Sequence, residues 1–155
     1  MRQRGFTLIE MLVVLAIVGL LASAARPMLT LTHQRSQEFE LRSALRNLRT
    51  AIDAYKRASD EGRVGKPADA SGYPPDLQAL VDGVPDIRTA SGERIYFLRS
   101  LPRDPFADPT LPAAQTWALR AYDSPPNSPR EGRDVFDIHS RAERIALDGS
   151  NVKDW

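Results

Sequence analysis

The sequence predicts an α+β protein in which a long N-terminal helix packs on a small antiparallel sheet. Three observations support this fold class: an apolar run over residues 6–25, helical spacing of apolar residues over 41–55, and three short strand-like segments after residue 90. A chain of 155 residues has room for one ordinary domain. We expect a leader peptide at residues 1–5, a hydrophobic transmembrane helix at 6–29, and a head at 30–155 that includes the amphipathic half of the helix.

The N-terminus combines a short basic leader with an apolar segment. Arg2 and Arg4 precede Gly5, and the segment after them is almost free of ionisable side chains. About 20 apolar residues form a helix of roughly 30 Å, which is the thickness of the hydrocarbon core of a bilayer. The positive-inside rule then predicts a cytoplasmic leader and a translocated C-terminus. A secretory signal cut near residues 23–25 and a plain membrane anchor are the alternatives.

Neither alternative explains the carboxylate of Glu10 within the apolar segment. An ionisable group costs roughly 2.5 to 3.5 kcal/mol at the centre of a membrane helix, and less near the interface. Such a group needs a partner. Cleavage between Gly5 and Phe6 would create an ammonium at Phe6, in the same chain or in a neighbouring one, that could pair with Glu10. In the simpler alternative, Glu10 complements the dipole at the helix N-terminus, which is worth under about 1 kcal/mol.

The second half of the predicted helix is amphipathic. Apolar residues recur every three or four positions and mark one helix face, whereas arginines lie off that face. The apolar residues are Leu41, Leu45, Leu48, Ile52 and Tyr55. This face predicts packing on the head. Pro27 is expected to kink the helix because proline removes a backbone hydrogen bond, and Gly62 is expected to cap its C-terminus.

The rest of the chain alternates short elements with proline-rich connections. Residues 62–75 predict a loop, and 75–81 predict two helical turns ending at Gly83. Residues 94–98, 117–122 and 135–139 predict strands, and in the last of these Phe136 and Ile138 should share one face. Prolines in 101–106 and 124–129 exclude regular strand pairing there.

Composition argues against several classes of function. The chain has no cysteine, which excludes disulfides and thiolate chemistry, and its formal net charge of +1 gives no reason to expect nucleic-acid binding. No Walker loop or nucleophile elbow is present. The two histidines, His33 and His139, lie far apart in the sequence and suggest no base beside a nucleophile. We therefore expect a protein that is not an enzyme.

The segment Gly5-Phe6-Thr7-Leu8-Ile9-Glu10 resembles the type IV prepilin signature. The resemblance implies cleavage between Gly5 and Phe6 by a prepilin peptidase and N-methylation of Phe6 by the same enzyme. It also implies that Glu10 pairs with the N-terminus of a neighbouring subunit during assembly, and that Pro27 kinks the helix. The expected location is the bacterial inner membrane, in contact with lipid before assembly, with a single span, a cytoplasmic N-terminus and a periplasmic head.

The head resembles the major pseudopilin of type II secretion systems. The resemblance rests on Tyr73-Pro74, on the turn at residues 101–106, on residues 134–140 and on Trp155. It implies a homopolymer, joined by minor pseudopilins and built on an inner-membrane platform, that forms a periplasmic pseudopilus for protein export. A subunit of a type IV pilus or of a DNA-uptake pseudopilus is the alternative. Phe106, where the related turn has tryptophan, and the stretch 141–147 depart from the pattern.

The family's C-terminal loop binds Ca²⁺, and three aspartates here could supply oxygen ligands: Asp137, Asp148 and Asp154. Ca²⁺ takes about 6 to 8 oxygens, more than this set offers by itself. The competing interpretation assigns these aspartates to turns and to the surface. A calcium site at the C-terminus is therefore an expectation that rests on the resemblance.

Overall fold

A computed structural model describes residues 7–155, and for residues 22–29 it describes the backbone alone. The chain divides into two compact units, residues 1–36 and 37–155. Gly5 and Phe6 lie outside the described residues. The first unit is helical from Leu8 onward and belongs to the long helix α1, which spans Leu8–Asp60. α1 is helical through Pro27, whose side chain is not described, so the kink stays a prediction.

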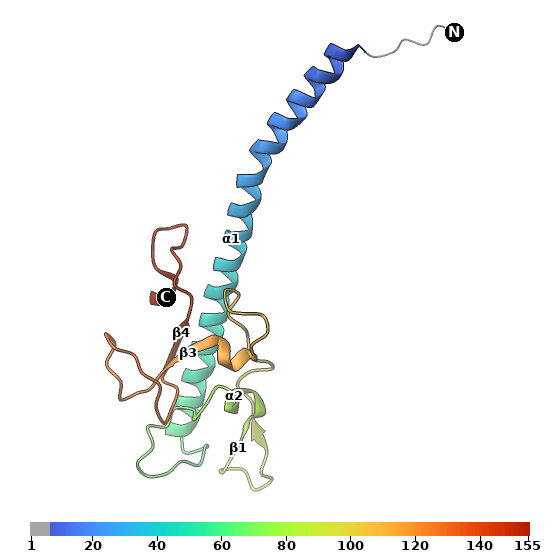
Figure 1. The fold of residues 1–155 in the computed structure, drawn as a ribbon. Helices are drawn as coiled ribbons and strands as arrows, with labels where there is room; N and C mark the ends of the chain where they lie inside the picture. Colours follow the sequence, from blue (N-terminus) through green and yellow to red (C-terminus); the bar gives the residue numbers. More distant parts are fainter. Residues whose placement is uncertain (1–6) are drawn as a thin grey trace. The chain divides into compact units, whose positions relative to one another are not determined.

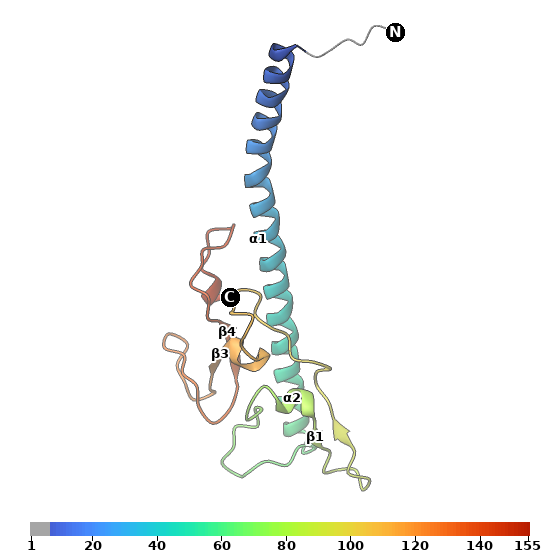
Figure 2. The same cartoon turned by 45° about the vertical axis from the view of Figure 1, so that its right-hand side comes forward.

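The predicted apolar face of α1 is confirmed in the second unit. The five apolar residues between 41 and 55 are at most 7% exposed, and they form a core with Trp117 and Ile138. Figures 1 and 2 both show β3 and β4 beside the part of α1 that belongs to this unit. The spacing of the apolar residues therefore identified the surface on which the sheet packs.

The predicted C-terminal cap of α1 is also confirmed. Gly62 has a φ angle of +70°, and its N–H donates to the oxygen of Ser59. The N–H of Arg63 donates to the oxygen of Ala58. This pair of bonds is the Schellman motif, which requires the left-handed conformation that glycine adopts without strain.

The head contains two separate two-stranded antiparallel sheets. Strand β3, Trp117–Arg120, pairs with β4, Asp137–Ser140, in a register that places Leu119 opposite Ile138. Strand β1, Val84–Pro85, pairs with β2, Arg94–Ile95. The 3-10 helices η1, Ala113–Thr116, and η2, Val152–Asp154, complete the regular structure described.

Several predicted elements are shorter in the structure. Helix α2 is one turn, Ala79–Asp82, because Asp76 accepts the N–H of Ala79 and organises the preceding residues as a turn. β2 ends at Ile95, three residues earlier than expected, and β3 ends at Arg120 instead of residue 122.

The strand predicted at residues 135–139 is confirmed with shifted bounds, Asp137–Ser140. Phe136 immediately precedes β4, and its N–H donates to the oxygen of Arg120 at 2.9 Å, next to the Arg120–Asp137 pair of the ladder. The Phe136 ring meets the rings of Tyr73 and Tyr122 edge-on, at centroid distances of 5.0 and 5.6 Å.

Candidate functional site

The first turn of α1 holds the carboxylate of Glu10 in a defined place. Thr7 immediately precedes the helix, and its hydroxyl accepts the N–H of Glu10 at 3.3 Å. The carboxylate of Glu10 reaches back toward the N–H of Thr7 at 3.5 Å, a long hydrogen bond. These reciprocal contacts form a capping box, in which two backbone N–H groups at the helix start gain acceptors. The Thr-x-x-Glu spacing is readable in the sequence, and it adds a local partner for Glu10 to the Phe6 ammonium and the helix dipole considered above.

The surface of α1 around Glu10 is strongly apolar. Between residues 8 and 21, large hydrophobic side chains are 47% to 79% exposed on all sides of the helix. They are Leu8, Ile9, Met11, Leu12, Val13, Val14, Leu15, Ile17, Val18, Leu20 and Leu21. A helix that is apolar all around needs an apolar environment. Glu10 is thus an acid within an otherwise apolar surface.

The described residues contain no helix that is both long enough and apolar enough to cross a membrane.

The structure separates one predicted calcium ligand, Asp148, from the other two, Asp137 and Asp154, which line one hollow. Asp137 begins β4, and its carboxylate accepts from Arg49 Nε at 2.8 Å. Asp148 lies in the 145–151 turn and accepts from Arg42 Nη2 at 2.6 Å. Asp154 is exposed in η2. Within residues 7–155 no group of three or more His, Asp or Glu side chains is arranged to hold a metal ion.

The electrostatics of these aspartates follow from their hydrogen bonds. The hydroxyl and N–H of Ser150 both donate to Asp148, and together with the charge of Arg42 they hold the pKa of Asp148 below its ordinary value. Asp137 and Asp154 line a hollow of about 480 Å³ that Asp148 does not line. His139 lines the same hollow; burial lowers its pKa, and the charge of Asp137 opposes that effect.

Both oxygens of Asp148 accept hydrogen bonds, and Oδ1 of Asp137 accepts two, one of them from the guanidinium of Arg49. A calcium ion takes about 6 to 8 oxygen ligands, and the positive charge of a neighbouring guanidinium opposes its binding. The three aspartates thus form no single cluster in this arrangement, and calcium binding stays a prediction.

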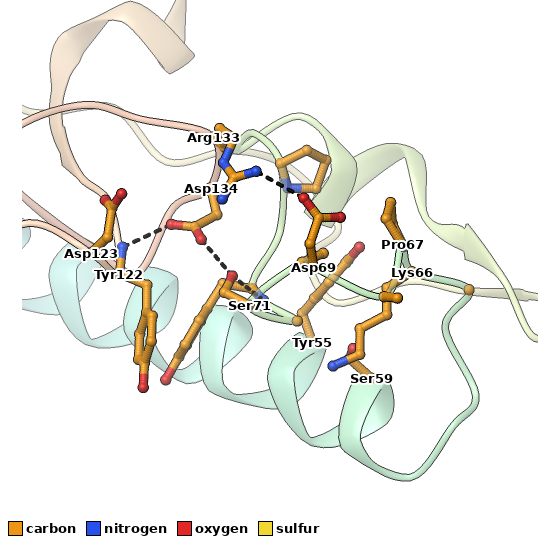
Figure 3. Close-up of a pocket in the computed structure, with 16 residues that line it drawn as sticks. Tyr55, Ser59, Lys66, Pro67, Asp69, Ser71, Tyr122, Asp123, Arg133 and Asp134 are labelled. Atoms are coloured by element: carbon orange, nitrogen blue, oxygen red, sulfur yellow. Dashed lines mark hydrogen bonds and ion pairs between the residues drawn. The ribbon is translucent and has the colours of Figure 1, made fainter.

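A second hollow, of about 550 Å³, lies between the end of α1 and two loops (Figure 3). Its polar side chains largely bond to one another: Asp134 accepts from the hydroxyl of Ser71 and from the N–H of Tyr122, and Arg133 pairs with Asp69. These bonds join the 65–75 loop to the 122–134 segment. The polar side chains that line this hollow therefore serve to hold the two loops together.

The two histidines lie in different elements of the fold. His33 is exposed on α1, whereas His139 lies half-buried on β4. The features that stand out are the capped Glu10 with its apolar surroundings and the arginine-bound C-terminal segment.

Comparison with known proteins places these features in a family. The sequence pattern described as the prokaryotic N-terminal methylation motif matches residues 1–25. The type II secretion system core protein G of Aeromonas hydrophila is 34% identical over 113 residues, which cover 70% of this chain and 71% of that protein. The chain belongs to the type II secretion system core protein G family. The core protein G of Klebsiella pneumoniae is 35% identical over 109 residues, covering 68% of this chain and 70% of that protein.

Similarity extends beyond core protein G to pilins. The type IV major pilin protein PilA of Myxococcus xanthus is 37% identical over 75 residues, which cover 48% of this chain and 33% of that protein. No solved structure is significantly similar. Core protein G membership makes the chain a pilin-like subunit, and none of these relatives' names describes an enzyme.

Proposed function

We propose that this chain is the major pseudopilin of a type II secretion system, a subunit that polymerises into a periplasmic pseudopilus and thereby drives protein export. Family membership and the methylation motif over residues 1–25 support the proposal. In this proposal a prepilin peptidase cuts between Gly5 and Phe6 and N-methylates Phe6. The peptidase is the enzyme, and this chain is its substrate.

Before assembly, the mature subunit resides in the bacterial inner membrane through segment 6–29. The support is the exposed apolar surface of residues 8–21, which lipid would cover. Arg2 and Arg4 precede this segment and keep the leader on the cytoplasmic side. The head, from residue 30 onward, is then periplasmic.

The observation that carries the proposed mechanism is the Glu10 carboxylate within the apolar surface of α1. Cleavage turns Phe6 into a cationic N-terminus. When apolar helices of several subunits pack together, the ammonium of Phe6 in one subunit and Glu10 of a neighbour neutralise each other. An unpaired charge in an apolar environment is costly, so only the register that pairs them is favoured. Van der Waals contact between the helices compensates for the loss of lipid.

The capping box makes two tests of Glu10 separable. Glutamine can occupy the same capping position as glutamate but carries no charge. Glu10→Gln should therefore leave the helix start intact and abolish fibre formation. Thr7→Ala removes the cap and keeps the charge, so it should still yield fibres. The matched control is Glu40→Gln, a neutralised exposed glutamate elsewhere on α1.

Fibre formation would be measured by electron microscopy and by cross-linking in cells that carry the secretion system. Intact mass of the purified chain would establish processing: the expected N-terminus is methylated Phe6. A chain that still begins at Met1 in the presence of the peptidase would refute the processing step. Normal fibres from Glu10→Gln would refute the charge-pairing step.

On the basis of membership in the core protein G family, the proposed partners are further copies of this chain, minor pseudopilins and an inner-membrane assembly platform. Co-purification of the cross-linked chain with these components would test the assignment.

A subunit of a type IV pilus is the second candidate, because pilins are also similar to this chain. Those matches cover 48% and 39% of the chain, less than the core protein G matches. A DNA-uptake pseudopilus would call for a basic surface, whereas the charge of this chain is nearly balanced. Deleting the gene should stop protein export if the first candidate is right, and should stop surface piliation or DNA uptake if the second is.

A further inference from the structure

We infer that Arg42 and Arg49 of α1 clamp residues 137–155 onto the helix, and that this arginine clamp holds the C-terminal segment without a metal ion. Both arginines lie within the head unit, on the same helix as the core-facing leucines. They are seven residues apart, which is about two helical turns, so they occupy the same side of α1. The clamp would operate whether or not the chain forms fibres.

Arg49 joins the start of β4 to the last residue. Its Nε donates to Asp137 Oδ1 at 2.8 Å, and its Nη2 donates to the backbone oxygens of Ile138 at 3.1 Å and Trp155 at 2.7 Å. The guanidinium presents several donors in one rigid plane, which allows a single side chain to hold separate acceptors. Two segments 17 residues apart in the sequence are thereby fixed to one point on α1.

Arg42 holds the turn that precedes Trp155. Its Nη2 donates to Asp148 Oδ2 at 2.6 Å, and its guanidinium lies over the Trp155 ring, 3.9 Å from the centroid. The indole N–H of Trp155 donates to the Ser150 hydroxyl at 2.7 Å, and that hydroxyl donates to Asp148 Oδ1 at 2.6 Å. Arginine, aspartate, serine and tryptophan therefore form a closed ring of contacts. Such a ring restrains each member more than an isolated ion pair does.

A third contact from α1 supports the same segment. Glu38 lies one turn before Arg42, is 5% exposed, and accepts the N–H of Leu147 at 2.9 Å. Three charged side chains along α1 thus bind different parts of the C-terminal segment. Because the arginines use the carboxylates of Asp137 and Asp148, an added dication would have to displace them against their own positive charge.

The test uses the full-length chain in detergent micelles and compares Arg42→Gln and Arg49→Gln with Arg46→Gln. Arg46 is an exposed arginine on α1 between the two, which makes it a matched control for charge removal. Thermal unfolding would be followed with and without millimolar Ca²⁺ and with EDTA. Quenching of Trp155 fluorescence by acrylamide would report release of the C-terminal segment. The Trp155 signal is obtained by subtracting the fluorescence of the same variant that also carries Trp155→Phe, which leaves only Trp117.

We expect Arg49→Gln to lower Tm by roughly 3–10 °C, because hydrogen bonds to a charged group are lost. Arg42→Gln should increase quenching of Trp155, since the ring loses its cover, and Arg46→Gln should match the unaltered chain in both measurements. Ca²⁺ and EDTA should leave Tm unchanged.

Two results would overturn the inference. One is a rise in Tm with Ca²⁺, or a fall with EDTA, in the unaltered chain, because either would show that a metal ion holds the head. The other is the finding that Arg42→Gln and Arg49→Gln both have the same Tm and the same Trp155 quenching as Arg46→Gln.

Discussion

The buried carboxylate of Asp104 offers a sharp test of how the head is held together. Asp104 is 2% exposed and lies in the proline-rich turn at residues 101–106. Its carboxylate accepts the N–H of Phe106 at 2.8 Å and the hydroxyl of Ser140. Its own N–H donates to Thr116 Oγ1 at 3.2 Å. One residue therefore joins this turn to β4 and to η1.

Replacing Asp104 with alanine would leave the Ser140 hydroxyl and the Phe106 N–H without their acceptor. Ser140 is 1% exposed, so water cannot easily replace that acceptor. Each buried polar group left unsatisfied costs about 1–3 kcal/mol. Two such groups predict a loss of roughly 2–6 kcal/mol in the free energy of unfolding. At about 3–5 °C per kcal/mol for a unit of this size, that corresponds to a fall in Tm of roughly 6–30 °C.

The matched control for this substitution is Asp108→Ala. Asp108 also precedes a proline and accepts the N–H of the residue two positions later, at 2.8 Å, but it is exposed. The two variants therefore differ in burial and in the contact with Ser140. Thermal unfolding would be followed through Trp117, whose indole N–H donates to Pro102 at the same turn. Equal Tm values for the two variants would refute the reasoning.

Two further predictions concern glycine geometry and acid. Gly83→Ala should destabilise the head more than Gly62→Ala. Both glycines have positive φ, but of the two only Gly83 would place the new Cβ against a backbone atom, the oxygen of Ile95 at 2.9 Å. Chemical denaturation of both variants would measure the difference in their free energies of unfolding. Because Ser150 holds the pKa of Asp148 below its ordinary value, the stabilisation from Asp148 is complete at neutral pH and is lost as the pH falls below about 4. Asp148→Asn should remove this part of the acid dependence of Tm, and an unchanged profile would contradict it.

Sequence reasoning succeeded where structure depends on near neighbours along the chain. The spacing of Leu41, Leu45 and Leu48 identified the buried face of α1, because helical periodicity places them together. Gly62 marked the helix end for a similarly local reason. The capping box of Thr7 and Glu10 is equally local and could have been predicted from its spacing.

Strand limits were harder to predict because pairing decides them. β1 contains a proline and spans only Val84–Pro85, so its residues carry little strand signal, and its existence depends on β2 beyond the intervening turn. β4 begins at Asp137, two residues later than predicted, and ends at Ser140, one residue later, because the partners available on β3 set its limits.

The sequence by itself determined the N-terminal signature, the family resemblance and the amphipathic face of α1, since each is a property of residues close together in the chain. Tertiary structure alone decided the partners of the charged side chains. Arg49 meets an aspartate 88 residues away, and Arg42 meets one 106 residues away. Periodicity shows that an arginine lies off the apolar face, but it does not show which carboxylate folds against it. For this reason the sequence suggested Asp137 and Asp148 as metal ligands, whereas in the folded chain both aspartates pair with arginines of α1.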